Sequence, residues 1–243
     1  YIYLKEHIDR LGIVLDCCTK PSHDFGRMDF FNQMFSELKS YLSENGVNTI
    51  LVACPSCHKM FRTYAPEFRL ETVYEVMART GIKISDDISE KLAVHDPCAV
   101  RFENKIHDSV RTLLSRQGFD MVEMPHEKDK TFCCGEGGAA GCMAPHLAYE
   151  WPRKRAGEAK GNNVATYCAG CVHYLSKNIN TMHALDLIFY PQETVNNKRR
   201  VYKAPFTYLN RMLIKRKLKK ISSGTTRERT FNSRANLRKN KAA

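Results

Sequence analysis

Residues 133–138 read Cys-Cys-Gly-Glu-Gly-Gly, and they form the centre of a longer cysteine pattern. Cys98 precedes them in the motif His95-Asp-Pro-Cys98, and Cys168 and Cys171 follow them as a CxxC. Thiolates are soft ligands that suit iron–sulfur clusters, Cu(I) or zinc. The side chains of a vicinal pair diverge, so two neighbouring thiolates reach different irons of an extended cluster more readily than they hold one small tetrahedral ion. The pattern therefore favours an iron–sulfur cluster over zinc or a purely structural role.

The glycines of the central stretch support the same interpretation. Gly135, Gly137 and Gly138 let the backbone fold tightly and point N–H groups toward sulfur. We therefore predict that these three positions line the bound cofactor. A CxxC on its own is weaker evidence, because zinc sites use it too.

A second copy of the pattern lies earlier in the chain. Shifting the sequence by 114 to 116 residues superposes Cys17-Cys18 on the later vicinal pair and Cys54-Pro-Ser-Cys57 on the later CxxC. Each CxxC follows an apolar, β-branched stretch and is followed by a histidine, His58 or His173. A repeat of this kind dictates the architecture, and it predicts two similar halves with a metal site in each.

The repeat also predicts a residue that the sequence does not contain. The counterpart of Cys98 in the first half would lie upstream of Tyr1. Because the chain does not begin with Met, we expect that the first half has lost its start rather than that it lacks this cysteine.

Apolar stretches with strand-like or helical spacing alternate along the chain. A strand at 49–53 runs directly into Cys54, where Pro55 suits the first turn of a helix. The alternation predicts an α/β fold of two similar halves with mostly parallel sheets, one per half. The cysteines then fall at the carboxyl ends of strands, where ligands of an open parallel sheet gather. The predicted strands are 11–16, 49–53, 70–73, 91–95, 120–123 and 164–167, and the predicted helices are 28–42, 74–79, 102–117 and 144–159.

Charge separates the chain into a body and a tail. The 243 residues carry a net charge of +12. Residues 198–243 hold 16 Lys and Arg against one acid, whereas residues 1–197 hold 22 against 25 acids. We expect a first domain at 1–90, a second at 91–197 and a basic tail at 198–243. No run of about 18 apolar residues is present in the sequence, which argues against a membrane span, and clustered cysteines in a chain of this length indicate metal binding or redox work.

Within the tail, residues 206–220 are predicted to form a helix, and 222–243 are predicted to be disordered. Three interpretations of the basic helix stay open. It lies on an anionic membrane surface, it binds an acidic redox partner, or it is a solvated end of the chain. Few aromatic residues are interleaved with the basic run, which argues against nucleic acid as a partner.

With these motifs in place, the chain resembles the cysteine-rich CCG domain family. The resemblance rests on His95-Asp-Pro-Cys98, on the CCGEGG stretch and on the spacing to the CxxC, and it covers roughly residues 11–190. The family includes the catalytic subunit of heterodisulfide reductase and iron–sulfur subunits of glycolate, lactate and glycerol-3-phosphate oxidising systems. It implies a pair of similar α/β domains that bind [4Fe-4S] clusters. In the heterodisulfide reductase branch, five cysteines hold a non-cubane cluster that cleaves a disulfide.

The resemblance also implies which cysteines bind. It assigns one complete cluster to Cys98, Cys133, Cys134, Cys168 and Cys171. It assigns a second cluster to Cys17, Cys18, Cys54 and Cys57. Here Thr19 stands in place of the glycine after the vicinal pair, and four thiolates suffice for an ordinary cubane. Cys142 lies outside both motifs, either as a small buried residue or as a reactive thiol near the second motif.

Function is expected to follow from the clusters. We predict an oxidoreductase component that passes electrons between a flavoprotein or ferredoxin-type partner and a thiol/disulfide or quinone-linked acceptor, with His95 and Glu136 as candidate proton donors. The sequence contains no dinucleotide-binding or phosphate-binding motif, so a partner would supply the other half of the reaction. The alternative is a non-catalytic zinc or iron–sulfur scaffold that assembles a redox complex through its basic tail. We expect a cytoplasmic protein, at the cytoplasmic face of the membrane if the tail binds lipid.

Overall fold

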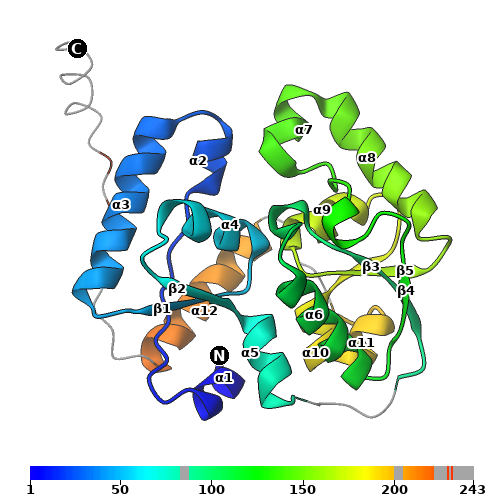
Figure 1. Ribbon diagram of the computed structural model, residues 1–243, viewed down its shortest axis with the longest axis horizontal. Coiled ribbons are helices and arrows are strands. Elements are labelled where there is room, and N and C mark those ends of the chain that lie inside the picture. The colour runs from blue at the N-terminus through cyan, green and yellow to red at the C-terminus, as the bar shows by residue number, and fades with distance from the viewer. Residues whose placement is uncertain (83–87, 200–204, 222–228, 230, 232–243) are drawn as a thin grey trace.

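The computed structural model describes residues 1–82, 88–199, 205–221, 229 and 231, and its strands form two parallel sheets surrounded by helices (Figure 1). The first sheet pairs β1 (Thr49–Val52) with β2 (Arg69–Thr72). The second sheet has the order β4-β3-β5-β6, and each neighbouring pair is parallel. Its strands are β3 (Lys91–His95), β4 (Asp120–Glu123), β5 (Asn163–Thr166) and β6 (Thr181–His183). The predicted α/β fold with mostly parallel sheets is confirmed.

Helices flank both sheets. Those of the first half are α1 (Ile2–His7), α2 (Lys20–Asp24), α3 (Met28–Glu44), α4 (Pro55–Tyr64) and α5 (Val73–Thr80). Those of the second half are α6 (Asn104–Arg116), α7 (Ala140–Met143), α8 (Pro145–Glu158), α9 (Ala169–Leu175), α10 (Ala184–Phe189) and α11 (Pro191–Val195). Short 3-10 turns lie at η1 (Cys98–Val100), η2 (Lys128–Lys130) and η3 (Gly137–Ala139).

Local sequence explains where the helices next to the cysteines begin. Cys54 and Cys168 are the N-cap residues of α4 and α9, so each CxxC spans the first turn of a helix. Pro55 occupies the first helical position of α4, where a missing N–H removes no helical hydrogen bond. Each strand therefore delivers its cysteines directly to the start of a helix, at the carboxyl edge of its sheet.

The largest hydrophobic core connects the two halves. Tyr74 and Met77 of α5 pack in the same buried cluster as Leu92 of β3 and Leu113 of α6. The guanidinium of Arg116 also donates a hydrogen bond to the Ala78 carbonyl at 2.7 Å. Because α5 precedes the predicted boundary and α6 follows it, the halves share a core, and the boundaries near residues 90 and 197 stay predictions.

One predicted element is wrong. Residues 11–16, expected as a buried strand, belong to no helix or strand, although the structure describes all of them. Val14 and Leu15 are 48% and 49% exposed. The shift of 116 residues that aligns Cys17 with Cys133 places this segment on residues 127–132, where the second half forms η2 rather than a strand. The repeat itself therefore indicates a loop before each vicinal pair.

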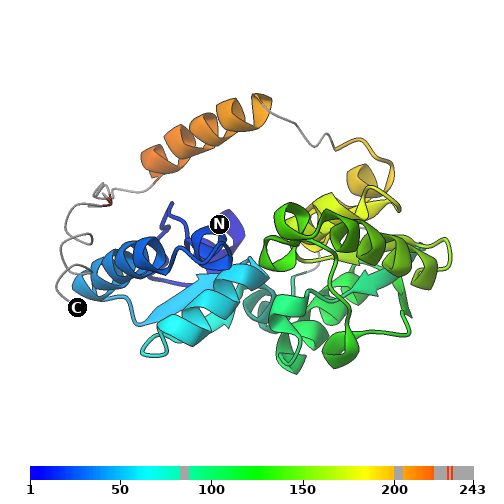
Figure 2. The ribbon, with the colours of Figure 1, turned by 90° about the horizontal axis from the view of Figure 1, so that it is seen from above.

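The other predicted strands and helices are confirmed to within two residues at each end. The sequence did not predict α1, α2, α7, β6, α10 or α11. The basic helix is confirmed as α12 (Phe206–Ile221), which Figure 2 shows set apart from the two sheets. The predicted disorder at 222–243 lies outside the described residues, apart from positions 229 and 231. Among the helices that the structure describes, none is long and apolar enough to cross a membrane.

Candidate metal centres

The second cysteine motif lies where the strand order of the second sheet reverses. β3 has β4 on one side and β5 on the other, although β4 comes between them in the chain. At such a switch point, the loops that leave neighbouring strands diverge and open a crevice that binds ligands. The loop after β3 carries Cys98, and the segment after β5 carries Cys168. The topology thus brings the distant ends of the motif to one edge of the sheet.

The five cysteines of this motif form one continuous group of sulfurs. Hydrogen bonds link them in the order Cys98, Cys133, Cys134, Cys171 and Cys168. Three of them are buried, the remaining two are partly buried, and none of the ten cysteines of the chain is in a disulfide. A largely buried set of five soft donors fits an iron–sulfur cluster better than it fits a hard, oxygen-seeking ion.

Each of the three glycines beside the vicinal pair meets a different structural requirement. The Gly135 N–H donates to Cys133 Sγ at 3.3 Å. Gly135 has φ +99°, and a Cβ there would lie 2.5 Å from the Ala148 carbonyl oxygen. A Cβ on Gly137 would lie 3.3 Å from Cys133 Sγ, whereas one on Gly138, at φ +63°, would meet nothing within 4 Å. Gly135 is thus needed for conformation and space, Gly137 for space beside sulfur, and Gly138 for conformation alone. Their contact with a cofactor stays a prediction.

The first-motif cysteines form a second group. Cys57 Sγ donates to Cys18 Sγ at 3.3 Å, and further hydrogen bonds link Cys17 to Cys18 and Cys54 to Cys57. Cys18 is buried, whereas Cys17 and Cys54 are exposed. The structure therefore gathers the four predicted ligands of the first motif into a more open site than the second.

Contacts within each group lower the pKa of some thiols and raise that of their neighbours, so they favour the thiolate, the form that binds metal, at particular cysteines. Hydrogen bonds from Cys17 and then Cys57 lower the pKa of Cys18 to about 3. Hydrogen bonds from Cys134 and then Cys98 lower the pKa of Cys133 to about 2. Each group thus contains a central thiolate that is present at neutral pH.

The two groups are neighbours across the boundary between the halves. Cys54 and Cys168 are close enough to interact electrostatically. Burial, followed by the charges of these two thiols, raises the pKa of Tyr74, whose hydroxyl donates to the Tyr167 carbonyl at 3.5 Å. α4 packs on η1 at the same boundary. A group bound by one motif would therefore lie beside a group bound by the other.

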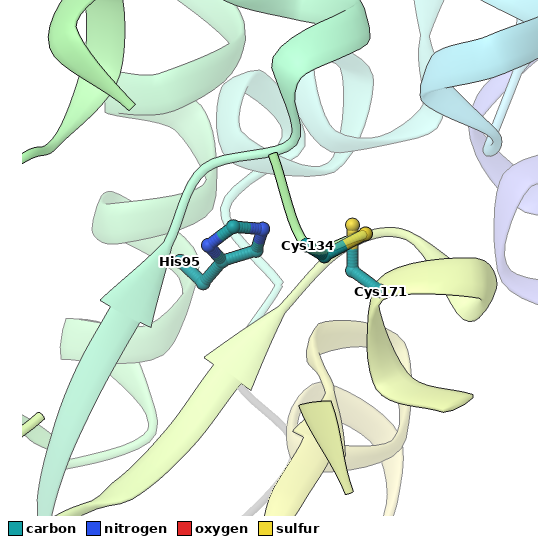
Figure 3. A group of neighbouring side chains, drawn as sticks. All are labelled: His95, Cys134 and Cys171. Carbon is teal, nitrogen blue, oxygen red and sulfur yellow. The ribbon is translucent and has the colours of Figure 1, made fainter. Parts of the chain in front are cut away.

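His95 closes the inner side of the second group. It is the last residue of β3 and is 0% exposed. A ring nitrogen lies within 4.8 Å of the sulfurs of Cys134 and Cys171, and Figure 3 shows its outer nitrogen directed toward them. Burial, and then the neighbouring Arg155, lowers the pKa of His95 to about 3. His95 therefore meets the sulfurs as a neutral imidazole.

Arg155, a residue that no motif singled out, holds His95 from behind. It is 1% exposed on α8, and its Nε–H donates to His95 Nδ1 at 3.2 Å. Its Nη1 donates to the His126 carbonyl at 2.8 Å and to the Glu158 carboxylate. Sequence reasoning missed Arg155 because an arginine in a polar helix carries no signal of burial.

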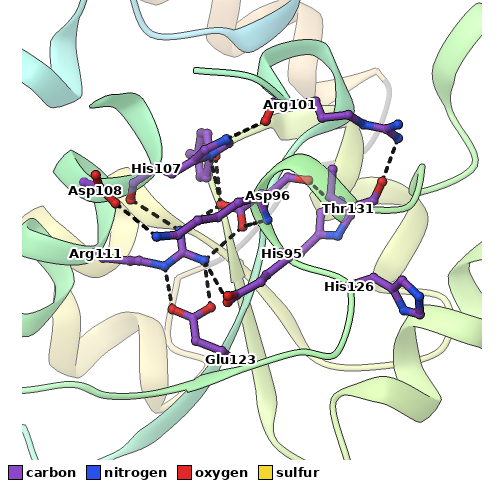
Figure 4. A network of polar contacts seen from close by, with 12 residues as sticks. His95, Asp96, Arg101, His107, Asp108, Arg111, Glu123, His126 and Thr131 are labelled. Atoms are coloured by element: carbon purple, nitrogen blue, oxygen red, sulfur yellow. Dashed lines mark hydrogen bonds and ion pairs between the residues drawn. The ribbon is translucent and has the colours of Figure 1, made fainter. Parts of the chain in front are cut away.

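Asp96 of the His-Asp-Pro-Cys motif anchors the surrounding loops (Figure 4). Its carboxylate accepts two hydrogen bonds from Arg111, each 2.9 Å, one from Tyr167 at 2.9 Å and one from the Lys128 N–H at 2.8 Å. Burial alone would raise the pKa of Asp96, but hydrogen bonds from His107 and Arg111 outweigh it and hold the pKa well below its usual range. The network ties the loop that carries Cys98 to β5 and to the chain before the vicinal pair.

Glu136 lies between the two motifs. Its carboxylate covers Gly170 inside the later CxxC and interacts electrostatically with Lys20 of α2. Burial raises the pKa of Glu136. Both predicted proton donors, His95 and Glu136, are therefore placed beside cysteines. Cys142 is exposed on α7, so the interpretation of it as a small buried residue is wrong.

The fold and the two groups of thiols define an α/β protein built to bind metal through sulfur. The chain matches the cysteine-rich domain CCG over residues 11–62 and 92–176, which is more than half its length. It belongs to that family.

The chain is similar to several iron–sulfur components of oxidoreductases. EtfAB:quinone oxidoreductase of Syntrophomonas wolfei is 25% identical over 53% of this chain and 19% of its own length. One subunit of the dihydromethanophenazine:CoB–CoM heterodisulfide reductase of Methanosarcina mazei is 26% identical over 57% of this chain and 36% of its own. The glycolate oxidase iron–sulfur subunit of Escherichia coli is 26% identical over 43% and 29%. The chain thus spans little more than a third of these relatives at most, and they support an iron–sulfur role in an oxidoreductase.

Proposed function

We propose that this chain is the cluster-bearing part of an oxidoreductase and binds two [4Fe-4S] clusters. One observation carries the proposal: two separate groups of hydrogen-bonded thiols, four in one and five in the other, lie side by side. A zinc site needs at most four ligands. A group of five sulfurs beside a group of four matches a pair of clusters instead.

The cysteines named above would hold these clusters, and the clusters would supply one-electron chemistry and, if the second is non-cubane, a site for disulfide sulfur. The chain itself does the rest. Cys134, Cys168 and Cys171 are buried, so they keep water from the inner side of the second site. The Gly135 N–H donates to Cys133 Sγ and orients it. The five-thiol site, with its fifth sulfur, is the one we propose for a thiol/disulfide or quinone-linked acceptor.

Reduction of a disulfide to two thiols consumes two electrons and two protons. We propose that Glu136 delivers protons at the outer side of the second site, because its carboxylate lies over the CxxC turn while its residue reaches the surface. His95, the other predicted donor, faces the sulfurs of Cys134 and Cys171 on the inner side, but its lowered pKa leaves it neutral, so we assign proton delivery to Glu136 and a hydrogen-bonding role to His95. A general acid must lie within hydrogen-bonding reach of the atom that it protonates.

A partner must exchange electrons with the clusters. We propose a flavoprotein or ferredoxin-type partner in the cytoplasm. Cys17 and Cys54 are exposed, which supports electron entry at the first motif.

We also propose that α12 attaches the protein to the cytoplasmic face of an anionic membrane. Leu209, Met212 and Leu213 are more than half exposed, and lysines and arginines fill the second half of the helix. Exposed apolar side chains next to clustered cations suit the boundary of an anionic bilayer. Binding to anionic vesicles but not to neutral ones, lost when residues 215–220 lose their positive charges, is the expected result. Equal binding to both vesicle types would contradict it.

Metal content tests the central proposal. Anaerobically purified protein is expected to contain about eight iron and eight sulfide per chain, the requirement of two [4Fe-4S] clusters. Replacing Cys168 and Cys171 with serine, or Cys54 and Cys57, should leave about half of each. Zinc without sulfide would overturn the proposal and favour the scaffold alternative.

A further inference from the structure

We infer that His95 donates a hydrogen bond from Nε2 to sulfur on the Cys134 and Cys171 side of the second site, and that Arg155 fixes the imidazole tautomer that makes this possible. His95 and Arg155 are thus positioning residues that raise the reduction potential of the cluster held there. The claim about the reduction potential rests on the proposed iron–sulfur function. The claim about the imidazole tautomer concerns the protein alone.

The tautomer follows from the donor that faces the ring. Arg155 Nε–H donates to His95 Nδ1 at 3.2 Å. A guanidinium has only donors, so Nδ1 must accept and cannot carry a proton. The proton of the neutral imidazole is therefore on Nε2. Because the other arms of Arg155 are held by the His126 carbonyl and the Glu158 carboxylate, the guanidinium cannot turn away without losing those bonds.

The proton on Nε2 needs an acceptor. Within the described residues, His95 Nε2 is buried and has no hydrogen-bond partner. A buried donor without an acceptor is costly, so native proteins seldom leave one. The atoms in reach are the sulfurs of Cys134 and Cys171, toward which the ring points (Figure 3). Sulfur that carries negative charge, as thiolate or as cluster sulfide, would accept this bond.

Arg155 adds a second buried donor on the same side. Its Nη2 also lacks a hydrogen-bond partner among the residues described, and the guanidinium interacts electrostatically with Cys171. Hydrogen bonds to sulfur and nearby positive charge stabilise the more negative, reduced state of a cluster. Both residues therefore act in one direction, toward a higher reduction potential.

The experiment compares variants by the potential of each cluster, followed by paramagnetic resonance in anaerobic redox titrations of the loaded protein. His95→Leu removes the donor and should lower the potential of the second-motif cluster, while the first-motif cluster, in the same molecule, stays unchanged. His95→Gln keeps an N–H donor at a similar reach and should restore most of the shift. His146→Leu, an exposed histidine on the same helix as Arg155, should change neither potential.

A second measurement does not depend on the cluster. Nitrogen-15 chemical shifts of His95 in the wild-type protein should show the Nε2–H tautomer, and Arg155→Met should allow the Nδ1–H form to appear. An Nδ1–H tautomer in the wild type, or an unchanged potential in His95→Leu with full iron content, would overturn the inference. If His95→Leu fails to bind the second-motif cluster, Arg155→Met provides the test instead. It should show the Nδ1–H tautomer and a lower potential of that cluster, and an unchanged tautomer and potential would overturn the inference. Iron and sulfide missing from the wild type would instead refute the proposed function.

Discussion

The carboxylate of Glu136 occupies the space that a side chain at position 170 would need. A Cβ on Gly170 would collide with both carboxylate oxygens of Glu136. The repeat places Lys20 where the second half has Glu136, and Ser56 where it has Gly170. Lys20 and Glu136 also interact electrostatically with each other. The two halves therefore differ at both of these equivalent positions, and only the second half has space for a carboxylate over its CxxC.

Gly170→Ala should displace this carboxylate without removing a ligand. If Glu136 delivers protons, Glu136→Gln should lower the rate of disulfide or quinone reduction by about 10²- to 10⁴-fold. Gly170→Ala should approach the same loss and should add little to Glu136→Gln in the double variant. Steady-state turnover per iron measures the effect, and Gly157→Ala, where a Cβ meets nothing within 4 Å, is the control. If the turnover rate of the double variant falls by the product of the two single losses, the two residues act independently and the prediction is wrong.

Gly135→Ala and Gly138→Ala form a matched pair, because both positions have positive φ and only the first lacks space. A Cβ at position 135 would press on the Ala148 carbonyl, so the vicinal cysteines must shift. We expect Gly135→Ala to lose about half of the bound iron, that of the second motif, and Gly138→Ala to retain nearly all of it with a small loss of stability. Iron and sulfide analysis with thermal unfolding provides the measurement. Equal iron loss in the two variants would show that backbone conformation alone matters.

Breaking the Asp96 network should be costly for stability. Asp96 and Arg111 form a buried, twofold hydrogen-bonded pair. Arg111→Met leaves the buried Asp96 carboxylate without its counter-ion and should reduce the free energy of unfolding by about 3–5 kcal/mol. Asp96→Asn should cost less than Arg111→Met, because Arg111 keeps its ion pair with Glu123. Urea unfolding of the loaded variants checks this. Arg153→Ala, which removes an exposed ion pair with Glu150, should cost less than about 1 kcal/mol. A similar cost for all three variants would contradict a special role for the network.

Protonation of His183 should contribute to acid destabilisation. His183 Nδ1 accepts the Leu185 N–H at 3.2 Å and caps α10, and burial lowers the pKa of His183. The unfolded chain, with a histidine pKa of about 6.5, therefore binds more protons, so stability falls as the pH drops below about 6.5 toward the lowered folded pKa. His183→Asn keeps a capping side chain that does not titrate. Urea midpoints measured between about pH 5 and pH 8 should fall less steeply in this variant, and parallel curves would exclude the contribution.

Much of the candidate site could be predicted from the sequence because ligand spacing is a local signal. The vicinal pair and the CxxC repeat at a shift of 114 to 116 residues, and the first CxxC starts a helix as Pro55 and the preceding strand indicate. Residues 11–16 were wrongly predicted as a strand because a short apolar run matches the strand pattern even where no neighbouring strand pairs with it. Arg155 and Arg111 could not be found in this way. Their burial depends on which loops meet at the edge of the second sheet, and that is set by strand order rather than by any motif.

The unequal exposure of the two thiol groups sets an order in which air would damage the protein. Cys17 and Cys54 are exposed, whereas Cys134, Cys168 and Cys171 are buried. Oxidation of cysteine follows thiolate character and access, so oxygen would reach the first motif first and leave the second intact for longer. A preparation exposed briefly to air would then be half-loaded in a defined way. It would keep the site proposed for the acceptor and lose the one proposed for electron entry.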